Sequence, residues 1–364
     1  MRPALLQARR LVDFPDGRNP ITWSRDGFST ILPYAQRTRT IASILSYDAL
    51  WRAEEGDVDG ALASCRAVIN SGRCIGDEPT MISMLVRLAC RGVALGRIER
   101  TLAQGEPSEE ALAALQHLLE KEEAEPLLLI GVRGERAMFD RFLDAVEAGD
   151  IPRRDLLRLA PRYGIEVSWR DSALLLTGLT IKNERAALLH HMTEYVEIAK
   201  LPVEEWAGAL EQWVAKHDQL PSLARALTAG PPRDLTLARM VEVHRHSQTV
   251  MRCAMVLTAL ERYRRANERW PDRLEDLVPA FLPRGVPRDP YDGELLRYHR
   301  ITDGVVVYSV GPDGQDDGGV KLTHRRISSP GPPPAGVDVG FRLWDPAQRR
   351  QAPKPNSDPA RDRP

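Results

Sequence analysis

The spacing of apolar residues predicts a chain built mostly of helices. From about residue 35 to residue 122, apolar residues recur at intervals of three and four, as in Ile41, Ile44 and Leu45. This is the period of an amphipathic helix. Similar segments continue to about residue 228 and are interrupted at prolines, which break helices. We therefore expect a helical domain over residues 1–230, arranged as an array of helical hairpins.

A Gly-Pro-Pro sequence at residues 230–232 marks the expected end of this domain. The following segment has the pattern of one long helix from about Asp234 to Asn267, which ends before Pro271 as a proline requires. Its apolar residues form a stripe along one helical face. The stripe consists of Val241, Val250, Ala254, Leu257 and Leu260.

After this helix the pattern changes to the alternation that is typical of strands. Two such runs, at residues 295–298 and 305–308, flank an Asp-Gly turn and predict an antiparallel hairpin. The expected fold class is α+β, mostly α, with a helical-hairpin array followed by a long helix and a small antiparallel β-sheet. The C-terminal module covers residues 234–345. Residues 346–364 combine prolines and charges with few bulky apolar side chains, so we expect a disordered tail.

One predicted helical hairpin, at residues 47–69, has a distinctive sequence, YDALWRAEEGDVDGALASCRAVI. It places Tyr47, Leu50 and Trp51 on the first helix and Gly56 at the turn, where a small residue lets two helices approach closely. The segment resembles a tetratricopeptide-type unit. Arrays of such units need about three copies to bury a continuous core, and no second copy occurs at a fixed period. We expect a lone hairpin, and the helical domain is otherwise unassigned.

The charge balance argues against nucleic acid as a partner. Lys and Arg number 50 and Asp and Glu number 51, which gives a net charge of -1 and no global field that would attract a polyanion. No segment approaches the roughly 18 to 20 apolar residues of a spanning helix, so no membrane anchor is expected in the chain as given. The N-terminal segment does not resemble a secretory signal. The expected location is the cytoplasm, or the cell envelope if a leader or anchor precedes these residues.

Sequence motifs of the common enzyme classes are missing. The chain has no GxSxG, no glycine-rich phosphate loop and no GxGxxG between a strand and a helix, and its four cysteines form no CxxC pair. We therefore expect a protein that is not an enzyme. An alternative is an enzyme with a helical active site around His190, His191 and Glu194, which lie within one helical turn and could hold a metal ion.

A second group of polar residues, Glu242, His244 and His246, also falls on a predicted helix. Residues two apart on a helix point to different faces, so the two histidines cannot chelate one ion. We expect these side chains on a solvated helix face.

Three consecutive segments of the C-terminal module carry a specific resemblance to a known family. They are ALERYRRANERWPDRLEDLVP at residues 259–279, VPRDPYDGELLRYHR at residues 286–300 and VVVYSVGPDGQDDGG at residues 305–319. In order and spacing they are similar to the periplasmic domain of the major pseudopilin of type II secretion systems. The resemblance implies a long helix, a short helix that packs back on it, and a β-hairpin that leads into a glycine-rich loop.

In that family the loop after the hairpin binds calcium through aspartate carboxylates and main-chain oxygens. By position, the resemblance implies the Val310 carbonyl and the Asp313 carboxylate as ligands. Asp316 and Asp317 add negative charge, and Asp338, at a short final strand, is the remaining candidate. Calcium prefers six to eight hard oxygen ligands, which a glycine-rich loop can supply. An insertion rich in Pro and Ser, at about residues 320–336, separates Asp338 from the loop.

The chain also differs from a pseudopilin, because a helical domain of about 230 residues stands in place of the apolar helix that packs the filament core. Our leading hypothesis is a non-enzymatic protein of the cell envelope or associated with type II secretion. In it, the helical domain binds a protein partner and the module is a calcium-stabilised cap. The alternative is a soluble helical scaffold or adaptor for a partner protein, in which the module is purely structural.

Overall fold

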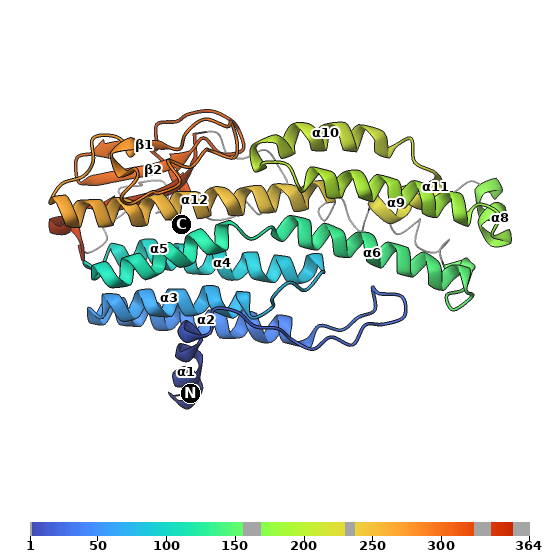
Figure 1. Ribbon diagram of the computed structural model, residues 1–364, viewed down its shortest axis with the longest axis horizontal. Helices are drawn as coiled ribbons and strands as arrows, with labels where there is room; N and C mark the ends of the chain where they lie inside the picture. Colours follow the sequence, from blue (N-terminus) through green and yellow to red (C-terminus); the bar gives the residue numbers. More distant parts are fainter. Residues whose placement is uncertain (1, 156–168, 230–236, 324–335, 352–364) are drawn as a thin grey trace, which may run out of the picture.

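The fold is α+β and mostly α, as predicted from the periodicity (Figure 1). A computed structural model describes residues 2–155, 169–229, 237–323 and 336–351. Within these ranges, no helix is both long enough and apolar enough to cross a lipid bilayer. The α-helices are α1 (Arg2–Arg9), α2 (Pro33–Glu55), α3 (Val58–Arg73), α4 (Met81–Leu102), α5 (Glu109–Glu123), α6 (Leu127–Glu147), α8 (Trp169–Thr177), α9 (Ile181–Ile198), α10 (Trp206–His217), α11 (Ser222–Ala229) and α12 (Leu237–Asn267).

Helices α2 and α3 form the predicted helical hairpin. Helix α2 ends at Gly56, whose φ of 88° lies in the left-handed region that glycine adopts without strain. The side chain of Asp57 then accepts a hydrogen bond from the Gly60 N–H and starts α3. Tyr47 and Trp51 are 67% and 59% exposed, so these two aromatic side chains point away from the hairpin rather than into its core.

The sheet has four strands in the order β1-β2-β4-β3, where β1 is Arg297–Ile301, β2 is Gly304–Ser309, β3 is Leu322–Thr323 and β4 is Asp338–Trp344. Strands β1 and β2 form the predicted antiparallel hairpin, and β4 pairs with β2 in the same sense. Strand β3 pairs with β4 in parallel, so the prediction of a purely antiparallel sheet is wrong at this edge. Parallel neighbours need a long connection between them, and the insertion supplies it.

Helix α12 is buried on almost all sides along its middle turns. From Thr249 to Glu261, every residue except Arg252 is buried. The sheet covers one side of α12 through β2 and β4, and α4 and α5 cover the opposite side (Figure 1). The single predicted stripe was therefore too narrow, because a helix that packs against neighbours on all sides has no polar face to reveal its period.

Two large hydrophobic cores occur among the described residues. The first core contains residues of α2, α3, α4 and α5, together with residues of the later turns of α12 and of the sheet. The other joins α6, α9, α10 and α11 with the first turns of α12, through Met240 and Val241. The predicted boundary at residues 230–236 lies outside the described residues. Helix α12 thus contributes to both cores, and the sheet shares its core with the N-terminal helices.

The first residues of the predicted disordered tail are ordered. Residues 346–351 contain the short 3-10 helix η6 (Pro346–Gln348), and Arg349 is only 7% exposed. Its guanidinium donates two hydrogen bonds to the buried Glu261 carboxylate of α12, at 2.9 and 2.7 Å. A buried bidentate ion pair fixes this segment, which composition alone could not indicate. Residues 352–364, the rest of the predicted tail, lie outside the described residues.

A buried ion cluster connects α3, α4 and α5. The fully buried carboxylate of Glu122 accepts hydrogen bonds from Arg73, from Arg87 Nη2 at 2.7 Å and from Arg91 Nε at 2.8 Å. Burial alone would raise the pKa of Glu122, but the positive charges of Arg91 and Arg87 outweigh it and lower the pKa to about 2. One buried carboxylate therefore binds three buried guanidinium groups, and Asp16 and Glu125 supply further negative charge to Arg73 and Arg87.

We predict that Glu122→Gln lowers the free energy of unfolding by about 4 kcal/mol, because buried guanidinium groups lose their counter-charge. Urea denaturation of the variant and of the parent chain measures the difference. The exposed Glu110→Gln on the same helix is the matched control and is expected to change stability by less than about 0.5 kcal/mol.

The same cluster gives the stability a defined pH dependence. A carboxylate whose folded pKa is lowered contributes stability above its ordinary pKa of 4.5, and this contribution is lost as the pH falls towards 2. The difference in stability between parent and Glu122→Gln should therefore shrink between pH 5 and pH 2. A difference that stays constant over this range would contradict the assignment.

Candidate functional site

The loop between β2 and β3 contains four of the five predicted metal ligands. Val310, Asp313, Asp316 and Asp317 lie on this loop, and Asp338 is the first residue of β4. The parallel pairing places Leu322 of β3 opposite Asp338, so the chain on either side of the insertion is held together at its base. This pairing returns Asp338 to the loop despite the intervening residues.

Asp338 is completely buried, and its side chain holds the loop by accepting hydrogen bonds from N–H groups of the loop main chain. Its Oδ2 accepts a hydrogen bond from the Gly319 N–H at 2.8 Å, and its Oδ1 accepts one from the Asp317 N–H at 3.4 Å. Burial raises the pKa of Asp338, the two N–H groups oppose this rise, and the nearby carboxylates of Asp316 and Asp317 add to it. The structure thus brings these three carboxylates into one acidic environment.

The other loop carboxylates differ in how well they are paired. Asp316 accepts hydrogen bonds from the Tyr308 hydroxyl and from the Gly318 N–H, both at 3.0 Å. Asp313 accepts a hydrogen bond from the Gln315 N–H at 3.2 Å through Oδ1 alone. The Oδ2 atoms of Asp313 and Asp317 are buried, although both side chains are only partly buried, and no hydrogen-bond partner for them occurs among the described residues. Within the described chain, two buried carboxylate oxygens on one loop therefore lack a donor, and burial of an unpaired polar atom is costly.

The donor set of this loop suits a hard cation in its chemistry. Carboxylate and main-chain oxygens are the ligands that calcium prefers, and the two unpaired Oδ2 atoms are available to it. In the part of the chain that the structure describes, no three His, Cys, Asp or Glu side chains converge closely enough to hold a metal ion by themselves. A calcium site here would therefore depend on main-chain oxygens as well.

A further carboxylate, Asp289, organises the start of the loop and was not identified from the sequence. It is completely buried at the end of the segment PRD, before the turn that leads to β1. Its side chain accepts hydrogen bonds from the Ser309 hydroxyl at 2.7 Å and from the Val310 N–H at 3.0 Å. It also accepts one from the Tyr291 N–H at 2.9 Å and pairs with Arg297.

Burial raises the pKa of Asp289, and its hydrogen bonds from Tyr291, Ser309 and Val310 oppose that rise. This residue fixes the end of β2, from which the loop departs. The sequence offered one signal for it, an aspartate in the turn segment PRDPYDG. Only the tertiary structure shows that this aspartate is directed inward, towards β2.

Of the three residues of the alternative helical active site, His190 and Glu194 lie close together and His191 does not join them. His190 is 80% exposed at its side chain and lies 3.7 Å from Glu194, which also pairs with Lys216. His191 is buried and its ring stacks on Trp213, with ring centroids 4.0 Å apart. Burial lowers the pKa of His191 to about 4. The structure therefore separates His191 from the other two residues and places it in an aromatic cluster.

The expectation of a solvated face for the second histidine group is wrong for His244. Its side chain is only 3% exposed, and burial lowers its pKa to about 4. Glu242, two residues before His244, accepts a hydrogen bond from the Tyr291 hydroxyl at 2.6 Å. The error arises because this part of α12 is covered by α6 and α10, which sequence periodicity does not reveal.

We predict that Asp289→Asn lowers the free energy of unfolding by about 3 kcal/mol, because an amide nitrogen would face buried N–H and O–H donors that now bind a carboxylate. The exposed Asp272→Asn, which removes only surface ion pairs, should cost less than about 1 kcal/mol. Chemical denaturation of both variants checks the contrast. Equal effects of the two substitutions would contradict the role given to Asp289.

Comparison of the chain with protein-family models, with curated proteins and with solved structures finds no match.

Proposed function

We propose that this is a non-enzymatic protein of the cell envelope or associated with type II secretion, whose C-terminal module is stabilised by calcium. The observation that carries the proposal is the pair of buried Oδ2 atoms of Asp313 and Asp317, to which the described residues donate no hydrogen bond. A divalent cation is the simplest partner for two buried carboxylate oxygens that receive no hydrogen bond. The resemblance of residues 259–319 to the major pseudopilin supports the same metal and the same cellular setting.

In this proposal Asp313 and Asp317 supply the carboxylates that bind the ion directly, and the Val310 carbonyl supplies a main-chain oxygen. Asp316 and Asp338 contribute charge close by. Asp338 keeps the loop closed through its hydrogen bonds to main-chain N–H groups. Calcium, when bound, would neutralise the repulsion among these carboxylates and so stabilise the loop and the sheet that carries it.

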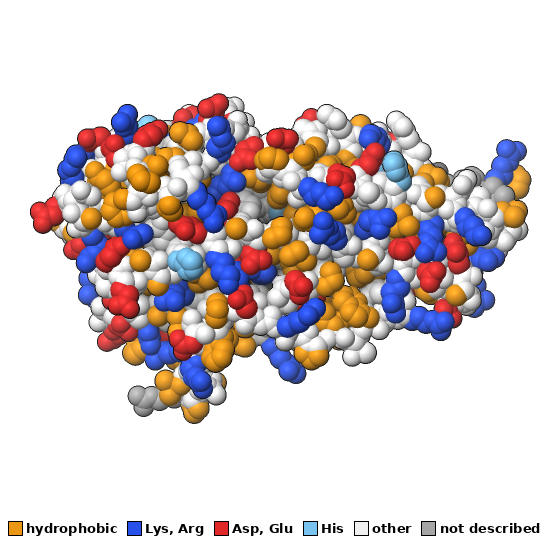
Figure 2. Space-filling view, viewed as in Figure 1, with side chains coloured by type: hydrophobic (Ala, Val, Ile, Leu, Met, Phe, Trp, Pro, Cys, Tyr) orange, Lys and Arg blue, Asp and Glu red, His pale blue; other side chains and the backbone are white. Residues whose placement is uncertain are grey.

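The surface of the helical part supports its proposed role in binding a protein partner. Basic and acidic side chains are interspersed over the face shown in Figure 2, without a strong separation of the two charges. Such a surface suits a protein partner better than a polyanion.

A second candidate is a helical scaffold or adaptor in which the module is only structural. The observation that favours it is the satisfaction of Asp338 by the N–H groups of Gly319 and Asp317, because this closes the loop without an ion. The two candidates differ in their response to calcium and in their location.

We predict that calcium raises the midpoint of thermal unfolding relative to chelator. A ligand bound only by the folded state adds about 2.7 kcal/mol when its free concentration is about 100 times the dissociation constant. The variants Asp313→Asn and Asp317→Asn should lose this shift. In chelator they should be at least as stable as the parent chain, because each replaces a carboxylate that has one buried, unpaired oxygen by a neutral amide.

The exposed Glu294→Gln, which lies in the same module, is the control and should keep the full calcium shift. Melting curves recorded with calcium, with magnesium and with chelator separate specific binding from a general salt effect. A parent chain that shows no calcium-dependent shift would exclude the calcium-stabilised module and leave the purely structural one.

We also predict that the native protein is found in the envelope fraction of its cells. Separation of cytosol, membrane and periplasm, followed by detection of the chain with an antibody, measures this. Recovery from the cytosol alone would contradict an envelope protein and would favour the scaffold or adaptor, whatever the result with calcium.

A further inference from the structure

The exposed side of α2 presents three large apolar side chains that the proposed function does not use. Ile44, Tyr47 and Trp51 are 42%, 67% and 59% exposed. Their spacing of three and four residues places them on one side of the helix. Single exposed apolar side chains are common on protein surfaces, but a continuous row that contains Tyr and Trp is typical of a contact site. Figure 1 shows α2 at the edge of the molecule that lies opposite the sheet.

The fold of the chain does not need this row of side chains. The opposite side of α2 is buried and packs on α3 and α4. Its apolar residues are Ala42, Leu45, Ala49 and Ala53. Small residues at these positions let the helices approach closely, and the three exposed side chains add nothing to that contact. The exposed row can therefore be substituted without opening the core.

The apolar row lies between a basic end and an acidic end of the same helix face. Arg37 and Arg39 are exposed in the second turn of α2, and Glu54 and Glu55 are exposed in its last turn. Arg37 and Glu55 are eighteen residues apart, which is five turns of 3.6 residues, so they lie on the same flank of the helix. Glu54 pairs with Arg100 at 2.9 Å. Arg37, Arg39 and Glu55 form no ion pair within the described residues.

This order of charges is complementary to itself when the direction of the helix is reversed. In an antiparallel pair of α2 helices, the basic end of each copy meets the acidic end of the other, and the same contact forms twice about a two-fold axis. The midpoint between Arg37 and Glu55 falls beside Tyr47, so the two Tyr47 side chains meet near the axis. Trp51 then lies beside the partner's Ile44. A parallel pair would instead place like charges opposite each other, which is unfavourable.

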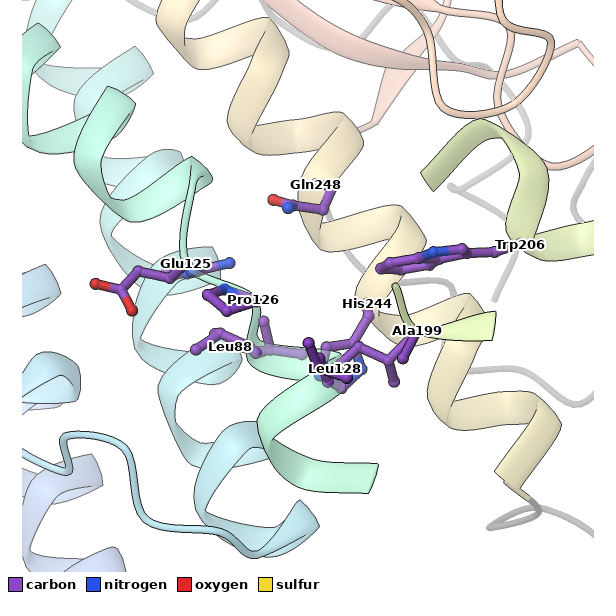
Figure 3. Close-up of a pocket in the computed structure, with 11 residues that line it drawn as sticks. Leu88, Glu125, Pro126, Leu128, Ala199, Trp206, His244 and Gln248 are labelled. Atoms are coloured by element: carbon purple, nitrogen blue, oxygen red, sulfur yellow. The ribbon is translucent and has the colours of Figure 1, made fainter. Parts of the chain in front are cut away.

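A protein surface fits this side of α2 better than a small molecule does. Small ligands bind in concave sites, whereas the exposed side of one helix is convex. The cavity shown in Figure 3 has a volume of about 50 Å³ and lies beside α12, between Trp206 and Pro126. A larger hollow, of about 330 Å³, lies at residues 282–288. Neither of these two spaces has a wall from α2, and a second helix is the kind of surface that packs on a helix face.

We propose that two copies of this chain form an antiparallel dimer through α2. Ile44, Tyr47 and Trp51 form the centre of the contact, and an ion pair between Arg37 and the partner's Glu55 forms at each end. One helix face is smaller than the roughly 800 Å² per partner of a standard interface, so we expect a reversible dimer with a dissociation constant in the micromolar range. The contact is separate from the acidic loop, so the dimer is expected with calcium and with chelator alike.

Sedimentation equilibrium of the full chain over micromolar concentrations measures the dissociation constant of the dimer. Trp51→Ala should weaken the dimer at least about tenfold, because a buried Trp at the centre of a contact contributes most to binding. Far-ultraviolet circular dichroism of this variant should stay unchanged. Trp169→Ala on α8, where the side chain is 77% exposed, is the matched control and should dimerise as the parent chain does.

Reversal of single charges tests the antiparallel arrangement. Arg37→Glu and Glu55→Arg should each weaken self-association at least about tenfold, because each homodimer then contains two pairs of like charges. An equimolar mixture of the two variants should associate with the affinity of the parent chain, because both pairs in the mixed dimer are complementary. Glu110→Arg, at an exposed position on α5, is the control and should leave dimerisation unchanged.

Three results would overturn the proposal. A parent chain that stays monomeric over this concentration range would leave the exposed side of α2 to a partner of different sequence or to residues 352–364. Undiminished dimerisation of Trp51→Ala and of both charge reversals would place the interface elsewhere on the chain. A mixture of the two charge reversals that associates no better than either variant alone would exclude the antiparallel arrangement.

Discussion

The requirement to cover α12 on all sides determines the rest of this structure. A helix that is apolar around its circumference cannot stay in water, and neither the N-terminal helices nor the sheet could enclose it alone. Helices α4 and α5 and strands β2 and β4 therefore pack on opposite sides of it. The C-terminal module is thus combined with the N-terminal helices through a shared core. The first turns of the same helix are covered by a second set of helices.

Buried carboxylates fix the loop beside this core. Asp289 binds the main chain where β2 ends, and Asp338 binds the main chain further along the loop. Both carboxylates accept hydrogen bonds from N–H groups, which replace the water that burial has removed. Asp313 and Asp317 differ, because the described residues donate no hydrogen bond to the Oδ2 atom of either carboxylate. The loop consequently has a defined shape, together with unsatisfied negative charge, which is the combination from which a cation site is built.

Periodicity predicted the elements whose pattern is local. The helices, the hairpin of β1 and β2, and the long helix ending at Asn267 all follow from spacing and from turn residues. The sequence could not reveal features that depend on distant partners. Strand β3 has two residues and is defined only by its pairing with β4. Asp289 and His244 fall in segments that suggest a turn and a solvated face, and their burial depends on β2, α6 and α10. Of the candidate site, the sequence identified the loop and its aspartates but not the residue that anchors its start.

The ion pair between Arg349 and Glu261 sets where the folded unit stops. The last strand ends at Trp344, and a boundary drawn there from secondary structure would look complete. Removal of the residues after Trp344 would leave the buried Glu261 carboxylate with Arg264 as its remaining cation. It would also remove the hydrogen bond that the Arg350 N–H donates to the Ala103 carbonyl. The C-terminal limit for producing a stable recombinant protein therefore lies beyond Arg350. A purification tag is best joined after that point.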